Sequence, residues 1–370
     1  MSCDLLSLAL PGVRKLQPYV PGKPIAELER EYGVHNAIKL ASNENPLGPS
    51  PLALAAARDC LQESSRYPDG NGFALKHSLA RKLGVAVNQI TLGNGSNDIL
   101  EFAARAFVAP DDEVVFSEHA FAVYPIVTQA VGGKARVAPA CAWGHDLAAM
   151  RALITERTRL VFIANPNNPT GTWLAAQELE DFIAALPAQA LAVVDEAYFE
   201  YAADMANDYP DALRWVGRYP NLIVARTFSK AYGLAGLRIG YSVSHADIAD
   251  ILNRVRQPFN VNSIALAAAE AALGDGEHLA RSIAVNRAGM AQLTSAFAAM
   301  GLAFIPSAGN FVSVDVGPKA GAIYQDLLYE GIIVRPVANY GMPQYLRISI
   351  GLPEENERFI TALKKVLAKS

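Results

Sequence analysis

Four stretches of polar residues follow short apolar runs, and they hold the groups most able to do chemistry. These stretches are 93–98 (GNGSND), 165–171 (NPNNPTG), 195–198 (DEAY) and 226–230 (RTFSK). Short apolar runs of this kind are typical of buried strands. Open α/β sheets bind ligands beyond the carboxyl ends of their strands. We therefore expect the four stretches to meet at one edge of a sheet.

The side chains in these stretches favour one kind of chemistry when they are taken together. Lys230 precedes small and apolar residues, and a low-polarity site would lower its pKa and make it an amine nucleophile. Asp195 could hold a pyridine nitrogen protonated, which turns the ring into an electron sink. Glycines at a helix start suit a phosphate group. The set is what pyridoxal 5'-phosphate requires, although each residue alone fits a turn, a helix cap or a solvated surface.

The elements that must position these residues alternate along the chain. Strand-like runs at 89–92, 113–117, 160–164, 191–194, 221–225 and 239–243 are separated by helical patterns, among them 97–107, 173–186 and 210–217. This alternation predicts an α/β fold with a mostly parallel central sheet and helices on both faces. A long helical pattern at 264–300 and shorter strand-like pieces near the C-terminus predict a smaller α+β domain. We expect an arm and part of the small domain in 1–44, the large domain in 45–255 and the small domain in 256–370.

Composition excludes several classes of protein. The 370 residues are 51% hydrophobic and 18% charged, with a net charge of −4, which argues against a disordered chain and against a strongly basic nucleic-acid-binding protein.

Three cysteines without a CxxC pair favour a reducing cytoplasm, and the N-terminal stretch does not resemble a signal peptide. The uncharged run 288–314 is interrupted by polar residues and predicts a buried helix and strand rather than a membrane span. The six histidines lack metal-ligand spacing.

Taken together, these motifs resemble those of the fold-type I pyridoxal-phosphate-dependent aminotransferases. Among them, the chain most resembles the histidinol-phosphate aminotransferases. The resemblance runs over nearly the whole chain. It includes LASNENP at 40–46, Tyr67-Pro68, the four strand ends and LRISIG at 346–351.

The resemblance implies roles for individual residues. Lys230 would form the Schiff base with the cofactor and move the proton, and Asp195 would pair with the pyridine nitrogen. Phe121, where the family often has Tyr, would stack on the ring. The remaining cofactor contacts would be Asn168 and Tyr198 on the ring oxygen, Ser96, Asn97, Thr227, Ser229 and Arg238 on the phosphate, and Tyr67 on the phosphate of the neighbouring subunit. The last contact implies a homodimer.

The same resemblance suggests the substrates. Arg347 and Arg335 would bind the anionic end of the substrate, and Tyr19 would fold over it. The implied reaction is transamination between L-histidinol phosphate and 2-oxoglutarate, giving imidazole acetol phosphate and L-glutamate, in histidine biosynthesis. Arg335 could instead form a structural ion pair.

Other readings of the sequence remain open at this point. An aromatic-amino-acid aminotransferase or a decarboxylase of phosphorylated amino acids would share the scaffold. A dinucleotide-dependent oxidoreductase would use the turn at 93–98, but it leaves Lys230 and Asp195 unexplained. A cofactor-sensing transcription regulator would need a DNA-binding module, for which the segment before residue 40 leaves little room.

Overall fold

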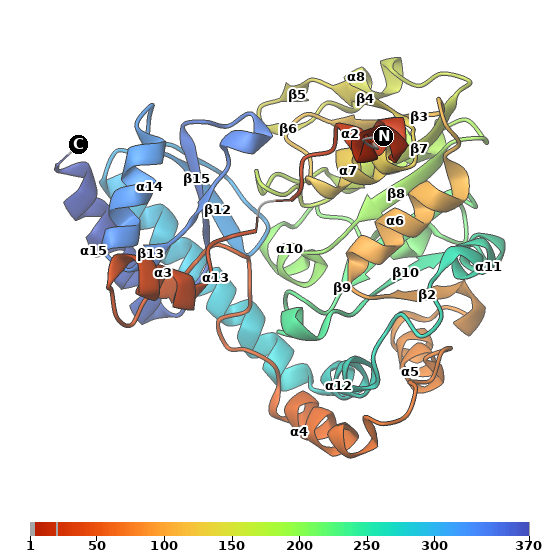
Figure 1. Ribbon diagram of the computed structural model, residues 1–370, viewed down its shortest axis with the longest axis horizontal. Coiled ribbons are helices and arrows are strands. Elements are labelled where there is room, and N and C mark those ends of the chain that lie inside the picture. The colour runs from red at the N-terminus through yellow and green to blue at the C-terminus, as the bar shows by residue number, and fades with distance from the viewer. Residues whose placement is uncertain (1–3, 20, 370) are drawn as a thin grey trace.

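A mostly parallel sheet forms the centre of the larger lobe of the computed structural model, which describes residues 4–19 and 21–369 (Figure 1). Its strand order is β2-β10-β9-β8-β7-β3-β4, and β10 runs antiparallel to both of its neighbours. The other pairs in this sheet are parallel. Its strands are β2 Ile90–Gly93, β3 Glu113–Ser117, β4 Lys134–Ala138, β7 Thr158–Ala164, β8 Leu191–Asp195, β9 Leu222–Thr227 and β10 Gly240–Ser244. The predicted α/β class is confirmed.

Both faces of this sheet are covered by helices, because successive side chains of its strands point to opposite sides. On β7, Phe162 packs in one core with α6, α7 and α11, whereas Ile163 packs in a second core with α5, α9 and α12. Such two-sided burial explains why the strands read as continuous apolar runs in the sequence. The α-helices are α1 Leu5–Leu8, α2 Pro11–Arg14, α3 Ile25–Tyr32, α4 Pro51–Cys60, α5 Phe73–Leu83, α6 Ser96–Phe107, α7 Val123–Ala130, α8 Leu147–Ala152, α9 Ala176–Ala184, α10 Phe199–Met205, α11 Ala246–Val255, α12 Ser263–Gly274, α13 Gly276–Ala299, α14 Ala320–Tyr329 and α15 Pro353–Leu367.

A second, antiparallel sheet lies beside the first, with the order β11-β12-β15-β14. Its core contains side chains of α13, α14 and α15. The N-terminal strand β1 pairs in parallel with β13 next to this lobe, so both chain ends contribute here. The strands are β1 Ile38–Lys39, β11 Phe304–Ile305, β12 Phe311–Asp315, β13 Ile332–Ile333, β14 Arg335–Pro336 and β15 Tyr345–Ser349, and a separate hairpin joins β5 Ala140–Cys141 to β6 Gly144–His145.

Two predicted helices differ from the structure. The pattern at 264–300 forms two helices, α12 and α13, because Gly274-Asp275-Gly276 interrupts it. The Asp275 carboxylate accepts a hydrogen bond from the His278 amide at 3.0 Å and caps α13. The pattern at 210–217 forms only the 3₁₀ turn η3. The 3₁₀ turns are η1 Leu61–Glu63, η2 Val87–Gln89, η3 Ala212–Trp215, η4 Ala235–Leu237 and η5 Ala338–Tyr340.

The division into domains at 44 and 255 stays a prediction. Helix α12, which follows residue 255, contributes four alanines to the core of the large sheet. Helix α13 then runs from beside α12 to the small lobe (Figure 1). Among the helices of the described residues, none is long and apolar enough to cross a membrane.

Candidate active site

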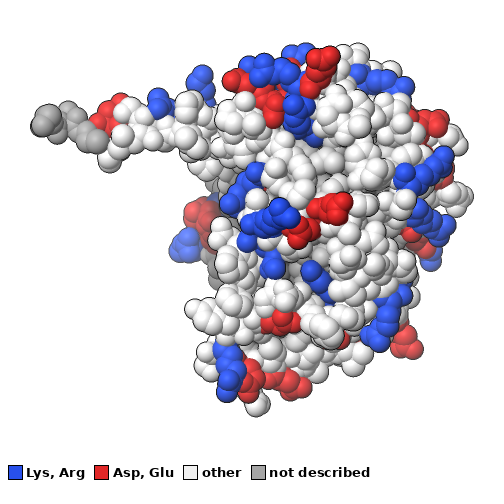
Figure 2. Space-filling model, turned by 90° about the vertical axis from the view of Figure 1, so that its right-hand side faces the viewer, with Lys and Arg blue, Asp and Glu red and all other residues white. Residues whose placement is uncertain are grey.

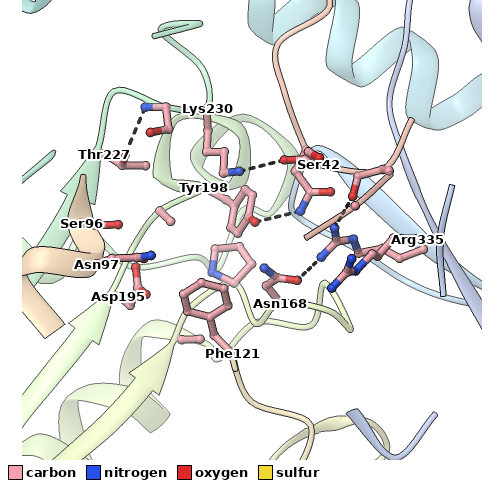
Figure 3. Close-up of a pocket in the computed structure, with 18 of the residues that line it drawn as sticks. Ser42, Ser96, Asn97, Phe121, Asn168, Asp195, Tyr198, Thr227, Lys230 and Arg335 are labelled. Atoms are coloured by element: carbon pink, nitrogen blue, oxygen red, sulfur yellow. Dashed lines mark hydrogen bonds between the residues drawn. The ribbon is translucent and has the colours of Figure 1, made fainter. Parts of the chain in front are cut away.

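A pocket lies at the carboxyl ends of β7, β8 and β9, where the two lobes meet (Figure 3). It brings together nearly all of the residues that the sequence singled out. Those that line it are Tyr19, Ser96, Asn97, Phe121, Asn168, Asp195, Tyr198, Thr227, Ser229, Lys230, Arg238, Arg335 and Arg347. The carboxyl ends of parallel strands share one edge of a sheet, which explains why segments far apart in the chain converge here.

Asp195 ends β8 and offers one free carboxylate oxygen. It shares a sheet face with Val193 and so points toward α7, where the Tyr124 hydroxyl donates to its Oδ2 at 3.1 Å. The other oxygen, Oδ1, is buried and has no partner in the described structure. Burial raises the pKa of Asp195 to about 6, while the Tyr124 hydrogen bond, the Ala197 backbone amide and the charge of Lys230 lower it. A buried acceptor of this kind suits a charged N–H donor such as a pyridinium nitrogen.

Lys230 lies across the pocket from Asp195, and its Nζ donates to the Ser42 carbonyl at 3.2 Å (Figure 3). Burial, assisted by the charge of Arg347, lowers the pKa of Lys230 to about 7. Much of the amine is therefore neutral near pH 7, as a nucleophile for an aldehyde must be.

The start of α6 forms a cradle of hydrogen-bond donors. Gly95 has φ +86°, and a Cβ at this position would overlap the guanidinium of Arg238. Arg238 Nη1 donates to Ser229 Oγ at 3.3 Å, and the Ser229 amide donates to Thr227 Oγ1 at 3.1 Å. Ser96 begins the helix with free amide groups at its positive end. This combination of helix terminus, hydroxyls and guanidinium fits a phosphate.

Tyr198 and Asn168 lie between the cradle and the small lobe. Burial raises the pKa of Tyr198 to about 12, so it keeps its hydroxyl proton at neutral pH. Its Oη accepts a hydrogen bond from Asn43 Nδ2 at 2.9 Å. Asn168 Oδ1 accepts from Arg347 Nη1, and this leaves the Asn168 amide nitrogen as a donor toward the pocket.

Two arginines form the small-lobe side of the pocket. Arg335 on β14 and Arg347 on β15 are register partners in the antiparallel pair, and they are 8% and 6% exposed. Arg347 donates to neutral oxygens, those of Asn168 and the Ala41 carbonyl. The Arg335 guanidinium lies 5.6 Å from the centroid of the Tyr19 ring. Like charges directly opposite each other are destabilising, so an anion between them would be strongly favoured.

Tyr67 is the one predicted site residue that the structure keeps out of this pocket. Its side chain is 83% exposed and stacks on Phe259, with ring centroids 4.8 Å apart. A residue that acts on a neighbouring subunit would look like this in a single chain, so the expected role of Tyr67 remains a prediction.

The structure also places residues at the site that the sequence interpretation missed. These are Tyr124, which bonds Asp195, and the Ser42 and Asn43 groups that bond Lys230 and Tyr198. Asn43 lies inside the LASNENP motif, which could have marked it. For Tyr124, the only feature of the sequence that could have indicated a role at the site is its position three residues after Phe121.

The donors and acceptors fit pyridoxal phosphate by their chemistry. The pocket offers a phosphate cradle, an unpartnered buried carboxylate oxygen, donors for a ring oxygen and an amine of lowered pKa within one cavity. In residues 4–19 and 21–369, no group of three or more His, Cys, Asp or Glu side chains could hold a metal ion.

The fold and this site define an aminotransferase of class I and II, and the family model of that description matches residues 35–363. Histidinol-phosphate aminotransferase 2 of Pseudomonas fluorescens is 64% identical over 100% of both chains, and that of Pseudomonas aeruginosa is 63% identical over 99% of both. The crystal structure of histidinol-phosphate aminotransferase from Sinorhizobium meliloti in complex with pyridoxal-5'-phosphate has a TM-score of 0.90 and 34% identity, covering 98% of each chain. The chain belongs to the histidinol-phosphate aminotransferase family.

Proposed function

We propose that this chain transfers an amino group between L-histidinol phosphate and 2-oxoglutarate, with pyridoxal phosphate held at Lys230. The products are imidazole acetol phosphate and L-glutamate, so the step belongs to histidine biosynthesis. The observation that carries the choice of substrate is the pair Arg335 and Arg347, buried and directly opposite in the β14–β15 ladder. Histidinol phosphate bears a phosphate where ordinary amino acids bear the α-carboxylate. Two guanidinium groups match a phosphate dianion better than a single carboxylate requires.

The residues around the cofactor have separate roles in the reaction. When bound, pyridoxal phosphate supplies an electron sink for the carbon that carries the substrate amine. Lys230 Nζ would take the proton from that carbon and deliver it to C4′ of the cofactor, and its lowered pKa suits both taking and giving a proton near neutral pH. Asp195 Oδ1 keeps the pyridine nitrogen protonated. Asn168 and Tyr198 hold the ring oxygen, and Phe121 stacks on the ring.

Binding and orientation fall to the rest of the pocket. The cradle of Ser96, Asn97, Thr227, Ser229 and Arg238 binds the cofactor phosphate, whereas the arginine pair binds the substrate anion at the opposite end. Tyr19, packed near Arg335, covers the substrate and limits the entry of water. In the second half-reaction the same arginines receive a carboxylate of glutamate.

The active unit in this proposal is a homodimer. Tyr67 would reach the cofactor phosphate of the partner chain, in keeping with its 83% exposure outside its own pocket. The first described residues extend from the body as an arm (Figure 2), on which Leu5, Leu6 and Leu8 are each more than 70% exposed. Apolar side chains left this open on one chain are typical of an interface. On the face that Figure 2 shows, acidic and basic side chains are interspersed, which supports small molecules rather than nucleic acid as partners, and we place the enzyme in the cytoplasm.

The visible absorbance of the purified protein tests this proposal. We expect a yellow band that fades when L-histidinol phosphate is added and returns with 2-oxoglutarate. A band that responds to phenylalanine but not to histidinol phosphate would favour an aromatic aminotransferase. Release of carbon dioxide from threonine phosphate would favour a decarboxylase. A protein that stays colourless with pyridoxal phosphate, or binds NAD tightly, would refute the whole assignment.

A further inference from the structure

Asn43 is buried beside the pocket in the segment 41–45, which crosses between the two lobes. Its side chain joins two others. The Asn43 Nδ2 group donates to Tyr198 Oη at 2.9 Å, and Ser349 Oγ donates to Asn43 Oδ1 at 3.0 Å. The exposed fractions are 1% for Asn43 and 3% each for Ser349 and Tyr198, so water does not compete strongly for these groups.

The directions of these bonds form one consistent chain that begins at an unambiguous donor. The backbone amide of Asn43 can only donate, and it donates to Ser349 Oγ at 2.7 Å. The hydroxyl proton of Ser349 remains available, and Ser349 Oγ donates it to Asn43 Oδ1. In this arrangement the Asn43 nitrogen faces Tyr198 and donates to its Oη. Because Tyr198 accepts this bond, its own single proton stays available for another acceptor.

We propose that Asn43 is a positioning residue that aims the Tyr198 hydroxyl proton into the pocket, and that Ser349 fixes the orientation of the Asn43 amide. The inference rests on the part of the proposed function that places the cofactor ring oxygen near Tyr198, and it is independent of the substrate. Ser349 lies on β15 two residues after Arg347, on the same face of the strand. The strand that presents an arginine to the substrate thus also orders the hydrogen bonds to the cofactor.

The chain offers a matched control for a purely structural role. Asn310 Nδ2 donates to the carbonyls of Asn43 and Glu44, at 3.0 and 3.3 Å. It anchors the same segment, but in the part of the chain that the structure describes it forms no hydrogen bond with Tyr198. A change at Asn310 therefore loosens the segment without reversing the polarity of the Asn43–Tyr198 contact.

The test is a pH titration of the visible absorbance of the cofactor-loaded protein, without substrate. A hydroxyl that donates to the ring oxygen stabilises its ionised form and lowers the pKa of the spectral transition. In Asn43→Asp a carboxylate draws the Tyr198 proton to itself, so we expect that transition to rise by about one pH unit or more. Asp also tolerates the left-handed backbone at this position, φ +55°. Ser349→Ala should give a smaller rise, and Asn310→Ala a change under about 0.2 units.

The Tyr198→Phe background decides whether the effect passes through Tyr198. There the shift caused by Asn43→Asp should fall to less than half, since only the charge of the new carboxylate remains. An undiminished shift, an unchanged transition in both Asn43→Asp and Ser349→Ala, or an equal shift in Asn310→Ala would overturn the proposal. If Asn43→Asp does not fold, Ser349→Ala gives the same answer. Failure of histidinol phosphate as a substrate would leave this titration intact, so the two ideas fail separately.

Discussion

At the scale of single residues, burial changes the chemistry of the two groups that face each other across the pocket. It lowers the pKa of Lys230 to about 7 and raises that of Asp195 to about 6. Each shift has the same cause, the cost of a charge away from water. The effect on Lys230 suits a nucleophile, whereas Asp195 needs help to stay ionised, which the Tyr124 hydroxyl and a pyridinium proton would provide.

The lowered pKa of Lys230 predicts how the cofactor is taken up. Only the neutral amine attacks an aldehyde, and a lysine of pKa about 7 is mostly neutral above that pH. In protein stripped of cofactor, the rate at which the yellow band forms with pyridoxal phosphate should rise from pH 6 and level off by about pH 8. An ordinary lysine, with a pKa of about 10.4, would show a rate still rising tenfold per unit at pH 9, and that profile would contradict the assignment. Lys230→Ala should form no such band.

Tyr124 offers a test of how Asp195 is held. Tyr124→Phe removes the hydrogen bond to Asp195 Oδ2, and bonds to charged groups contribute about 1.5–3 kcal/mol. We expect pyridoxal phosphate to bind about tenfold more weakly, measured by titrating the stripped protein. Thr128→Val is the control, because that hydroxyl donates only to the Tyr124 carbonyl within α7. Equal losses in the two variants would attribute the effect to α7 rather than to the bond.

At the scale of elements, the site depends on where strands end and helices begin. Asp195 is the last residue of β8 and Thr227 the last of β9, while Ser96 is the first of α6. Side-chain alternation sends Asp195 toward α7 and its neighbour Glu196 to the opposite face. There Glu196 forms a buried ion pair with Arg226 at 2.7 Å. A one-residue slip of β8 would exchange the two carboxylates, so the register of this strand decides which one meets the cofactor.

The turn before α6 predicts a selective defect. In Gly95→Ala the new Cβ would overlap Arg238 in the phosphate cradle and would be strained at φ +86°. We expect cofactor affinity to fall by more than tenfold, measured by equilibrium titration. Gly84→Ala is the matched control. Gly84 also has a positive φ, +69°, but nothing lies within 4 Å of an added Cβ. This variant should lose about 1–2 kcal/mol of stability and keep its affinity. A cofactor affinity unchanged in Gly95→Ala would show that the cradle is elsewhere.

At the scale of the whole molecule, the pocket combines the large lobe, the small lobe and the N-terminal segment. Lys230 follows the large sheet, Arg347 lies on the small sheet, and the Ser42 and Ala41 carbonyls that bond them come from the segment after β1. In the proposed function, neither lobe alone could bind both ends of the substrate. The proposed homodimer would add a contribution from a second copy, through Tyr67, which stacks on Phe259 outside its own pocket.

Mixed dimers would test that contribution. Tyr67→Ala should weaken cofactor binding about tenfold by loss of a phosphate contact, and Lys230→Ala should be inactive. When the two variants are mixed and exchange subunits, one site of each hybrid has an intact Lys230 and receives an intact Tyr67. Activity at limiting pyridoxal phosphate should then exceed that of Tyr67→Ala alone. If mixing with the inactive Lys230→Ala variant only lowers the activity of Tyr67→Ala in proportion to the amount added, Tyr67 acts within its own chain.

The sequence by itself determined the α/β class and named most of the polar residues that line the pocket. Two-sided burial makes each central strand a continuous apolar run, and the polar residues that end the run must lie at the sheet edge. Strand β3 matches its predicted residues, 113–117. Local glycines also decide structure, yet the break between α12 and α13 at Asp275 was hidden by the helical pattern on both sides.

Only the tertiary structure decided which groups touch. Tyr124 and Asp195 are 71 residues apart, and Asn43 reaches Tyr198 across 155 residues, distances over which no local pattern carries information. Arg335 and Arg347 became a pair through the β14–β15 register, which depends on strand pairing rather than on either segment. The shifted pKa values have the same origin, because burial is a property of the assembled lobes. Sequence could name the candidate groups, but packing sets their protonation and their partners.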